Sequence, residues 1–162
     1  MSQERPLRLM FICTGNICRS PMAEVLARSY AQDRRWNIDV CSSSLMGLKG
    51  NPAHPNAVKV CAEIDLDLTP HRAQPLTPDL LEWADWVLVM ELAHSRGARD
   101  MLPTKDDHIL LLGSFCGKLE IDDPLGGWKR RFRKSRDEIK DCVQNFMDRL
   151  PPDAGHLPGK QG

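Results

Sequence analysis

The sequence predicts an α/β fold: a single three-layer domain in which a central four-stranded parallel sheet carries helices on both faces. Four short apolar runs alternate with helix-like segments along the chain, and right-handed crossovers between parallel strands place the connecting helices on both faces. The length of 162 residues suits one domain. Ligands of such sheets bind beyond the carboxyl ends of the strands, so a functional loop is expected there.

The four predicted strands are short and apolar or alternating. The third is a continuous apolar run, which is typical of a strand covered on both faces. In chain order the strands are Leu7–Ile12, Trp36–Ser42, Trp86–Met90 and Ile109–Leu112.

The predicted helices follow from apolar residues at helical spacing. Thr77 is a candidate N-cap, followed by Pro78 in the first turn. Residues 42–55 are expected to form a loop, and the Pro- and Gly-rich residues 151–162 are expected to be a disordered tail after a folded domain of residues 1–150. The helices are Pro21–Arg34, Asn56–Glu63, Thr77–Trp83, Leu92–Met101 and Lys134–Leu150.

Composition narrows the class of protein. The chain contains 22 basic residues (lysine plus arginine) and 22 acidic residues (aspartate plus glutamate), so its formal net charge is zero. Neither a nucleic-acid nor a membrane partner is therefore expected. There is no apolar run of about 20 residues and no apolar signal-peptide core, and six irregularly spaced cysteines do not resemble a disulfide scaffold. We therefore expect a reduced, cytoplasmic protein. The scattered histidines predict no metal ion and no cofactor; the oligomeric state is not indicated.

The stretch from Leu7 to Arg28 organises the rest of the chain. A buried strand leads into Cys13, a tight polar loop and a helix start, which together form a nest of backbone N–H groups at a positive helix end. Such a site binds phosphate and favours the thiolate form of Cys13, while Arg19 can grip two phosphate oxygens. The Ser20 hydroxyl can donate to the thiolate. A nucleotide P-loop is a poor alternative, because the stretch lacks the Gly-Lys-Ser/Thr ending.

The string CTGNICRSPMAE, residues 13–24, closely resembles the signature of the low-molecular-weight protein tyrosine phosphatases. The resemblance covers residues 7–150 and implies hydrolysis of phosphotyrosine through a phosphocysteine intermediate. It assigns Cys13 as nucleophile and Arg19 as phosphate ligand. The remaining loop positions are implied to bind substrate: Thr14, Gly15, Asn16, Ile17, Cys18 and Ser20.

A phosphatase of this kind also needs a proton donor for the leaving oxygen. The loop Ile121–Gly127 contains an Asp-Asp-Pro sequence followed by two glycines. It resembles the Asp-Pro motif of the family, and the match places the acid on Asp123, with Asp122 as the alternative.

Other positions carry further implications of the resemblance. Asn16, Ser42 and His71 match a hydrogen-bonding network that stiffens the loop, and Cys18 matches a second cysteine that can pair with the nucleophile on oxidation. Ile17 occupies the position where relatives acting on phosphoarginine carry threonine. An apolar side chain there favours the flat ring of phosphotyrosine.

Two departures from the family pattern concern the walls of the pocket. Leu125 and Gly126 stand where aromatic residues usually follow Asp-Pro, and Trp128 is a candidate replacement. The loop Leu45–Asn51 lacks a tryptophan, and Leu48 is expected to serve instead, as in a bacterial subgroup linked to capsule and exopolysaccharide tyrosine kinases. The expected partner is therefore a phosphotyrosine-containing protein, with a bacterial tyrosine kinase as one candidate.

Three other functions stay open. A phosphoarginine phosphatase is disfavoured by Ile17. A thioredoxin-coupled arsenate reductase needs two more cysteines after the middle of the chain, and Leu76–Asp107 contains none. A catalytically dead phosphopeptide-binding module is the alternative from a different class, although Cys13, Arg19 and Asp123 are all present.

The basic run Lys129–Lys134 directly follows the proposed acid loop. It is either a solvated helix start or an electrostatic docking patch for acidic phosphorylated tails.

Overall fold

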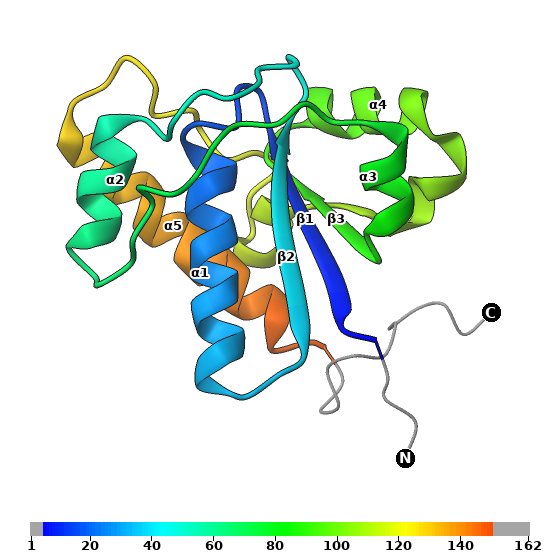
Figure 1. The fold of residues 1–162 in the computed structure, drawn as a ribbon, viewed down its shortest axis with the longest axis horizontal. Helices are drawn as coiled ribbons and strands as arrows, with labels where there is room; N and C mark the ends of the chain where they lie inside the picture. Colours follow the sequence, from blue (N-terminus) through cyan, green and yellow to red (C-terminus); the bar gives the residue numbers. More distant parts are fainter. Residues whose placement is uncertain (1–4, 151–162) are drawn as a thin grey trace.

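The centre of the molecule is a parallel sheet with the strand order β2-β1-β3-β4 (Figure 1). A computed structural model describes residues 5–150; the predicted tail, residues 151–162, lies outside them. The chain places β2 on one side of β1 and then β3 on the other side. The order in which strands are added therefore switches sides at β1, and α/β sheets bind ligands at such a switch point. The strands are β1 (Leu7–Cys13), β2 (Ile38–Ser44), β3 (Trp86–Val89) and β4 (Ile109–Leu111).

Helices cover both faces of the sheet, which confirms the predicted three layers. One face packs against α1, α2 and α5, and the other against α3 and α4 (Figure 1). Alternation along β1 divides its side chains between the two cores: Leu9 and Phe11 belong to the first, Met10 and Ile12 to the second. The helices are α1 (Arg19–Asp33), α2 (Pro55–Ala62), α3 (Pro78–Trp83), α4 (Leu92–Met101) and α5 (Lys129–Met147), with 3₁₀ segments Pro103–His108 and Leu112–Cys116.

The carboxyl ends of β1 and β3 bring distant segments to one edge of the sheet. The Met90 amide donates to the Ile12 carbonyl at 3.3 Å, and the Ile121 amide donates to the Met90 carbonyl at 2.9 Å. The loop that contains Asp123 is thereby fixed beside the end of β1, although more than 100 residues separate the two in the chain.

Some predicted boundaries are wrong by a few residues. Helix α1 begins at Arg19 instead of Pro21, because the Met22 amide already donates to the Cys18 carbonyl at 3.3 Å. Strand β2 runs two residues further than predicted, to Ser44, and takes the start of the predicted loop into the sheet. Helix α5 begins at Lys129, five residues before the predicted start, so the basic run forms its first turns.

Within residues 5–150, no helix has both the length and the apolar character required to cross a bilayer.

Candidate active site

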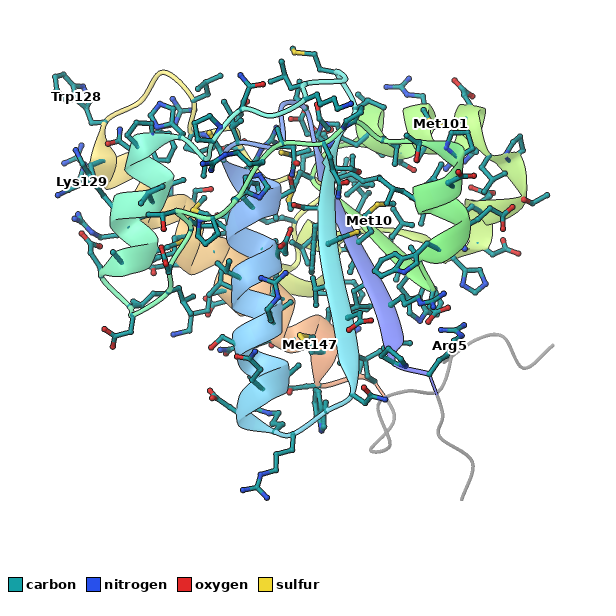
Figure 2. The ribbon with its side chains drawn as sticks, viewed as in Figure 1. Arg5, Met10, Met101, Trp128, Lys129 and Met147 are labelled. Atoms are coloured by element: carbon teal, nitrogen blue, oxygen red, sulfur yellow. The ribbon has the colours of Figure 1, made fainter. Side chains whose placement is uncertain are left out.

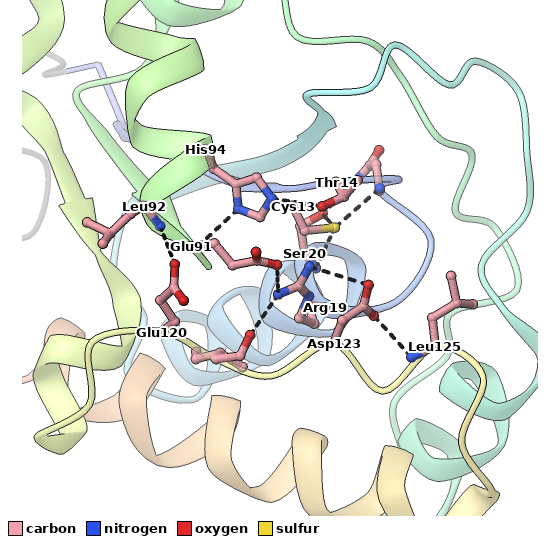
Figure 3. Close-up of polar contacts among 12 residues, drawn as sticks. Cys13, Thr14, Arg19, Ser20, Glu91, Leu92, His94, Glu120, Asp123 and Leu125 are labelled. Carbon is pink, nitrogen blue, oxygen red and sulfur yellow. Dashed lines mark hydrogen bonds and ion pairs between the residues drawn. The ribbon is translucent and has the colours of Figure 1, made fainter.

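The Cys13 thiol lies in a cradle made by the loop between β1 and α1 (Figure 3). Its Sγ atom accepts hydrogen bonds from the Asn16 amide at 3.2 Å and the Ser20 amide at 3.5 Å, and the Ser20 Oγ atom lies 2.9 Å away. Cys13 is buried, and two backbone amides and one hydroxyl lie within hydrogen-bonding distance of its sulfur. Groups that stabilise a sulfur anion in this way also bind phosphate oxygens.

Asn16 holds this cradle in shape from behind. Its backbone is left-handed, with φ of 56°, a conformation that asparagine adopts more readily than most residues. Its Nδ2 group donates to Ser20 Oγ at 2.8 Å and to Ser42 Oγ at 2.9 Å, and its Oδ1 atom accepts from the Gln74 amide at 3.0 Å. Because Ser20 Oγ accepts from Asn16, its own hydrogen is free to donate to the Cys13 sulfur.

His71 and Glu24 complete the support of the loop. The His71 Nε2–H group donates to the Asn16 carbonyl at 2.7 Å, and Ser42 Oγ donates to Glu24 Oε1 at 2.6 Å. The structure thus brings Asn16, Ser42 and His71 together. Glu24 was not predicted as a support residue. Its place within the CTGNICRSPMAE string was the sequence signal that could have identified it.

Arg19 is 1% exposed and carries three oxygen contacts at the edge of the pocket (Figure 3). Its Nη1 atom lies 2.6 Å from a Glu91 carboxylate oxygen and donates to the Ile121 carbonyl at 2.7 Å; Nη2 lies 3.6 Å from Asp123 Oδ2. A buried guanidinium needs such partners because desolvation of a charge is costly. Glu91 was not predicted as a site residue, although an acidic residue directly after a buried strand was a usable signal in the sequence.

The loop after Ile121 directs Asp123 into the thiol pocket. Asp123 Oδ1 accepts a hydrogen bond from the Leu125 amide at 3.0 Å, which fixes the carboxylate at the turn. Gly126, with φ of 85°, lets the chain close so that the Gly127 amide reaches the Pro124 carbonyl at 2.9 Å. Asp122, the alternative acid, does not line this pocket.

The pocket above the thiol combines a polar floor with apolar walls. Asn16 and Ser20 support the floor from behind, whereas the other predicted loop residues and Leu48 line the pocket directly. Met46, 65% exposed, and Leu125, 52% exposed, form walls that the sequence analysis did not predict. The lining residues are Cys13, Thr14, Gly15, Ile17, Cys18, Arg19, Met46, Leu48, Asp123 and Leu125.

Trp128 does not line the pocket, contrary to its predicted role as a replacement wall. Its side chain is 85% exposed and points away from the sheet (Figure 2). The reason is the early start of α5: Trp128 is the N-cap residue, and the turn at Gly126 and Gly127 carries it past the pocket. Leu125 occupies the wall in its place.

Cys18 is a buried thiol of a different kind from Cys13. Burial, followed by the proximity of Cys13, raises the pKa of Cys18 to about 12. It therefore stays protonated near neutral pH, although it lines the same pocket.

His94, in the first turn of α4, ties that helix to the loop between β1 and α1 (Figure 3). Its Nδ1 atom accepts from the Glu91 amide at 3.1 Å, so the proton resides on Nε2, which donates to Thr14 Oγ1 at 2.9 Å. Burial and the nearby Arg19 charge lower the pKa of His94 below its ordinary 6.5. A neutral imidazole thus positions the residue that follows the thiol.

Replacing His94 with alanine is expected to lower kcat/KM by about 10- to 100-fold, because the loop loses the bond that places Thr14. His94→Gln, which retains a donor, should recover part of the loss, and steady-state kinetics of the two variants test this. An unfolded His94 binds a proton near pH 6 and the folded one resists it, so the Tm advantage of wild type over His94→Gln should shrink as pH falls below 6.5. Equal activity in wild type and both variants would contradict the positioning role.

Metal ligands do not gather anywhere in residues 5–150: no three histidine, cysteine, aspartate or glutamate side chains are placed to hold an ion. The six cysteines are all free thiols.

A backbone cradle for an anion, with a thiol at its centre and a buried arginine at its edge, is what a cysteine-dependent phosphatase requires. The site and the parallel sheet therefore define this class of enzyme. The family model described as low molecular weight phosphotyrosine protein phosphatase matches residues 8–155. The chain belongs to that family.

Individual relatives agree with this assignment. A probable low molecular weight protein-tyrosine-phosphatase, EpsP, from Ralstonia solanacearum is 40% identical over 142 residues, which cover 88% of this chain and 94% of that protein. A protein-arginine-phosphatase from Bacillus subtilis is 33% identical over 147 residues, covering 90% and 97%. The structure of Vibrio vulnificus Wzb in complex with benzylphosphonate matches with a TM-score of 0.83 at 28% identity, covering 89% and 99%.

Proposed function

We propose that this protein hydrolyses phosphotyrosine in proteins through a phosphocysteine intermediate. The observation that carries the choice of substrate is the apolar wall around the thiol, formed by Ile17, Met46, Leu48 and Leu125. Apolar side chains at the mouth of an anion site suit an aromatic ring attached to a phosphate better than the charged guanidinium of phosphoarginine. The Vibrio relative bound to benzylphosphonate, a ring on a phosphonate, supports the same choice.

In the first step, the Cys13 thiolate attacks phosphorus, and the bond from phosphorus to the tyrosine oxygen breaks. Asp123 gives its proton to the leaving phenolate, while Arg19 and the loop amides hold the three equatorial oxygens. Leu125 supports this role because its amide fixes the Asp123 carboxyl group at the pocket.

In the second step, water attacks the phosphocysteine and phosphate leaves. Asp123, now ionised, accepts the proton from water, and the sulfur departs as a thiolate. The Ser20 hydroxyl, 2.9 Å from Sγ, stabilises that charge.

The proposed partner is a phosphotyrosine-containing protein, with a bacterial tyrosine kinase as the leading candidate, and the proposed compartment is the reducing cytoplasm. The resemblance at Leu48 to phosphatases linked to such kinases supports the partner.

Steady-state turnover without added metal, under reducing conditions, tests the activity. We expect kcat/KM for a phosphotyrosine peptide to exceed that for the matched phosphoarginine peptide by about 100-fold, because only the aromatic ring buries apolar surface against the walls of the pocket. The reverse preference would assign the protein to phosphoarginine. Binding of the phosphotyrosine peptide without turnover would make it a phosphopeptide-binding module.

Hydrogen peroxide is expected to inactivate the enzyme reversibly. We propose that peroxide oxidises the Cys13 thiolate to a sulfenic acid, which the Cys18 thiol then attacks to form a disulfide and release water. Dithiothreitol should restore activity in wild type but much less in Cys18→Ser, where further oxidation of Cys13 is irreversible. Equal recovery in both proteins would contradict this role of Cys18.

A further inference from the structure

A second small pocket lies on the other side of the acid loop from the thiol pocket. Asp123 and Leu125 face the thiol, whereas Asp122 and Pro124 face this second pocket. Its volume of about 50 Å³ exceeds the ~10–15 Å³ that a single water needs, so it has room for a small polar group. The lining residues are Asp122, Pro124, Arg131, Lys134, Ser135 and Glu138.

Ser135 is a hydrogen-bond donor without a partner in this pocket. The residue is 7% exposed, and within the described part of the chain its Oγ atom makes no hydrogen bond. Buried polar groups are nearly always satisfied. An unsatisfied hydroxyl at the wall of a pocket therefore indicates a missing acceptor.

The surroundings of the pocket are positively charged. We define the basic surface as the four exposed cations at the start of α5: Lys129, Arg130, Arg131 and Lys134. Among residues 5–150 none of the four forms an ion pair, whereas the nearby Arg133 and Arg136 share Glu63 at 2.6 and 2.8 Å. Two carboxylates line the pocket. Glu138 already pairs with Lys118 at 2.5 Å, so Asp122 alone remains to offset the positive charges of Arg131 and Lys134.

The basic surface conflicts with local helix preferences. The first turn of α5 contains three cations and no acidic residue, although the helix dipole is positive there, and Trp128 provides no side-chain cap. Gly127 leaves the space that the Arg131 side chain occupies, because a Cβ atom at position 127 would lie 2.5 Å from Arg131 Cδ. An arrangement that opposes local preference is typical of a binding surface.

We propose that the second pocket binds a carboxylate side chain of an acidic segment beside the phosphotyrosine of the protein substrate. The carboxylate accepts a hydrogen bond from Ser135 Oγ and pairs with Arg131 and Lys134, while the rest of the basic surface attracts the segment. The inference rests on the proposed function and adds a preference for acidic sequences. Because only residues 122–125 separate the pockets, one peptide can occupy both.

Two phosphotyrosine peptides test the proposal, one with aspartate and glutamate around the phosphotyrosine and one with the matching amides. In Arg131→Gln/Lys134→Gln, we expect kcat/KM to fall about tenfold for the acidic peptide and to stay unchanged for the amide peptide. Ser135→Ala should lower the acidic-peptide value about threefold, the loss expected for one hydrogen bond. The control is Arg35→Gln, which neutralises an exposed cation at the opposite end of the sheet.

An aryl phosphate distinguishes docking from damage to the acid loop. Its turnover should be the same in wild type and every variant, and KM should rise with salt for the acidic peptide alone. Equal losses for both peptides, or equal turnover of both by wild type, would overturn the docking inference and leave the proposed function intact. Failure of wild type to hydrolyse either peptide would instead overturn the proposed function.

Discussion

Cys13→Ser is expected to lower kcat for a phosphotyrosine peptide by about 10⁴- to 10⁶-fold, because a serine hydroxyl is not ionised near neutral pH and the attacking anion is lost. The cradle around the Cys13 sulfur remains, since it is made of the Asn16 and Ser20 amides. The dissociation constant of the peptide should therefore stay within a few-fold of the wild-type value. Single-turnover kinetics and calorimetric titration measure the two quantities.

The matched control for Cys13→Ser is Cys41→Ser. Cys41 is a half-buried thiol on β2 that does not line the thiol pocket, and burial raises its pKa to about 12. Its replacement should leave kcat unchanged. Substantial turnover by Cys13→Ser would rule out attack by the thiolate and indicate direct attack by water.

The parts of the site that the sequence reveals are those formed within one continuous stretch. The strand, loop and helix start around Cys13 and Arg19 fix their own geometry locally, so their spacing predicts it. Glu91 and His94 contact this loop from more than 70 residues away, and only the register of β3 beside β1 brings them there.

Two boundaries predicted from hydropathy are wrong, the end of β2 and the start of α5, because polar residues belong to both elements there. Ser43 and Ser44 are polar but buried in β2, because Ser43 Oγ donates to the Met10 sulfur at 3.4 Å and Ser44 Oγ donates to the Thr14 carbonyl at 2.7 Å. Their polarity predicted a loop. At α5, the first turns expose cations and bury Phe132 alone among the apolar residues, so the apolar periodicity starts late and predicted a helix that begins only at Lys134.

Asp123→Asn is expected to lower kcat for a phosphotyrosine peptide by about 10²- to 10³-fold, because an amide cannot protonate the leaving phenolate. The loss should be much smaller for an aryl phosphate with an acidic phenol, which leaves readily without a proton. Steady-state rates for both substrates between pH 5 and 8 test these expectations.

Asp122→Asn is the matched control, because it makes the same chemical change one residue away, on the side of the loop that faces the second pocket. Its kcat should be close to that of wild type for both substrates. A larger loss in Asp122→Asn would identify Asp122 as the general acid. The acid loop would then have to rearrange during the reaction so that Asp122 reaches the thiol pocket. Equal losses would mean that the loop, and not one carboxyl group, had been disturbed. We expect no such disturbance from Asp123→Asn alone, because asparagine can keep the hydrogen bond that the Leu125 amide donates to Asp123 Oδ1.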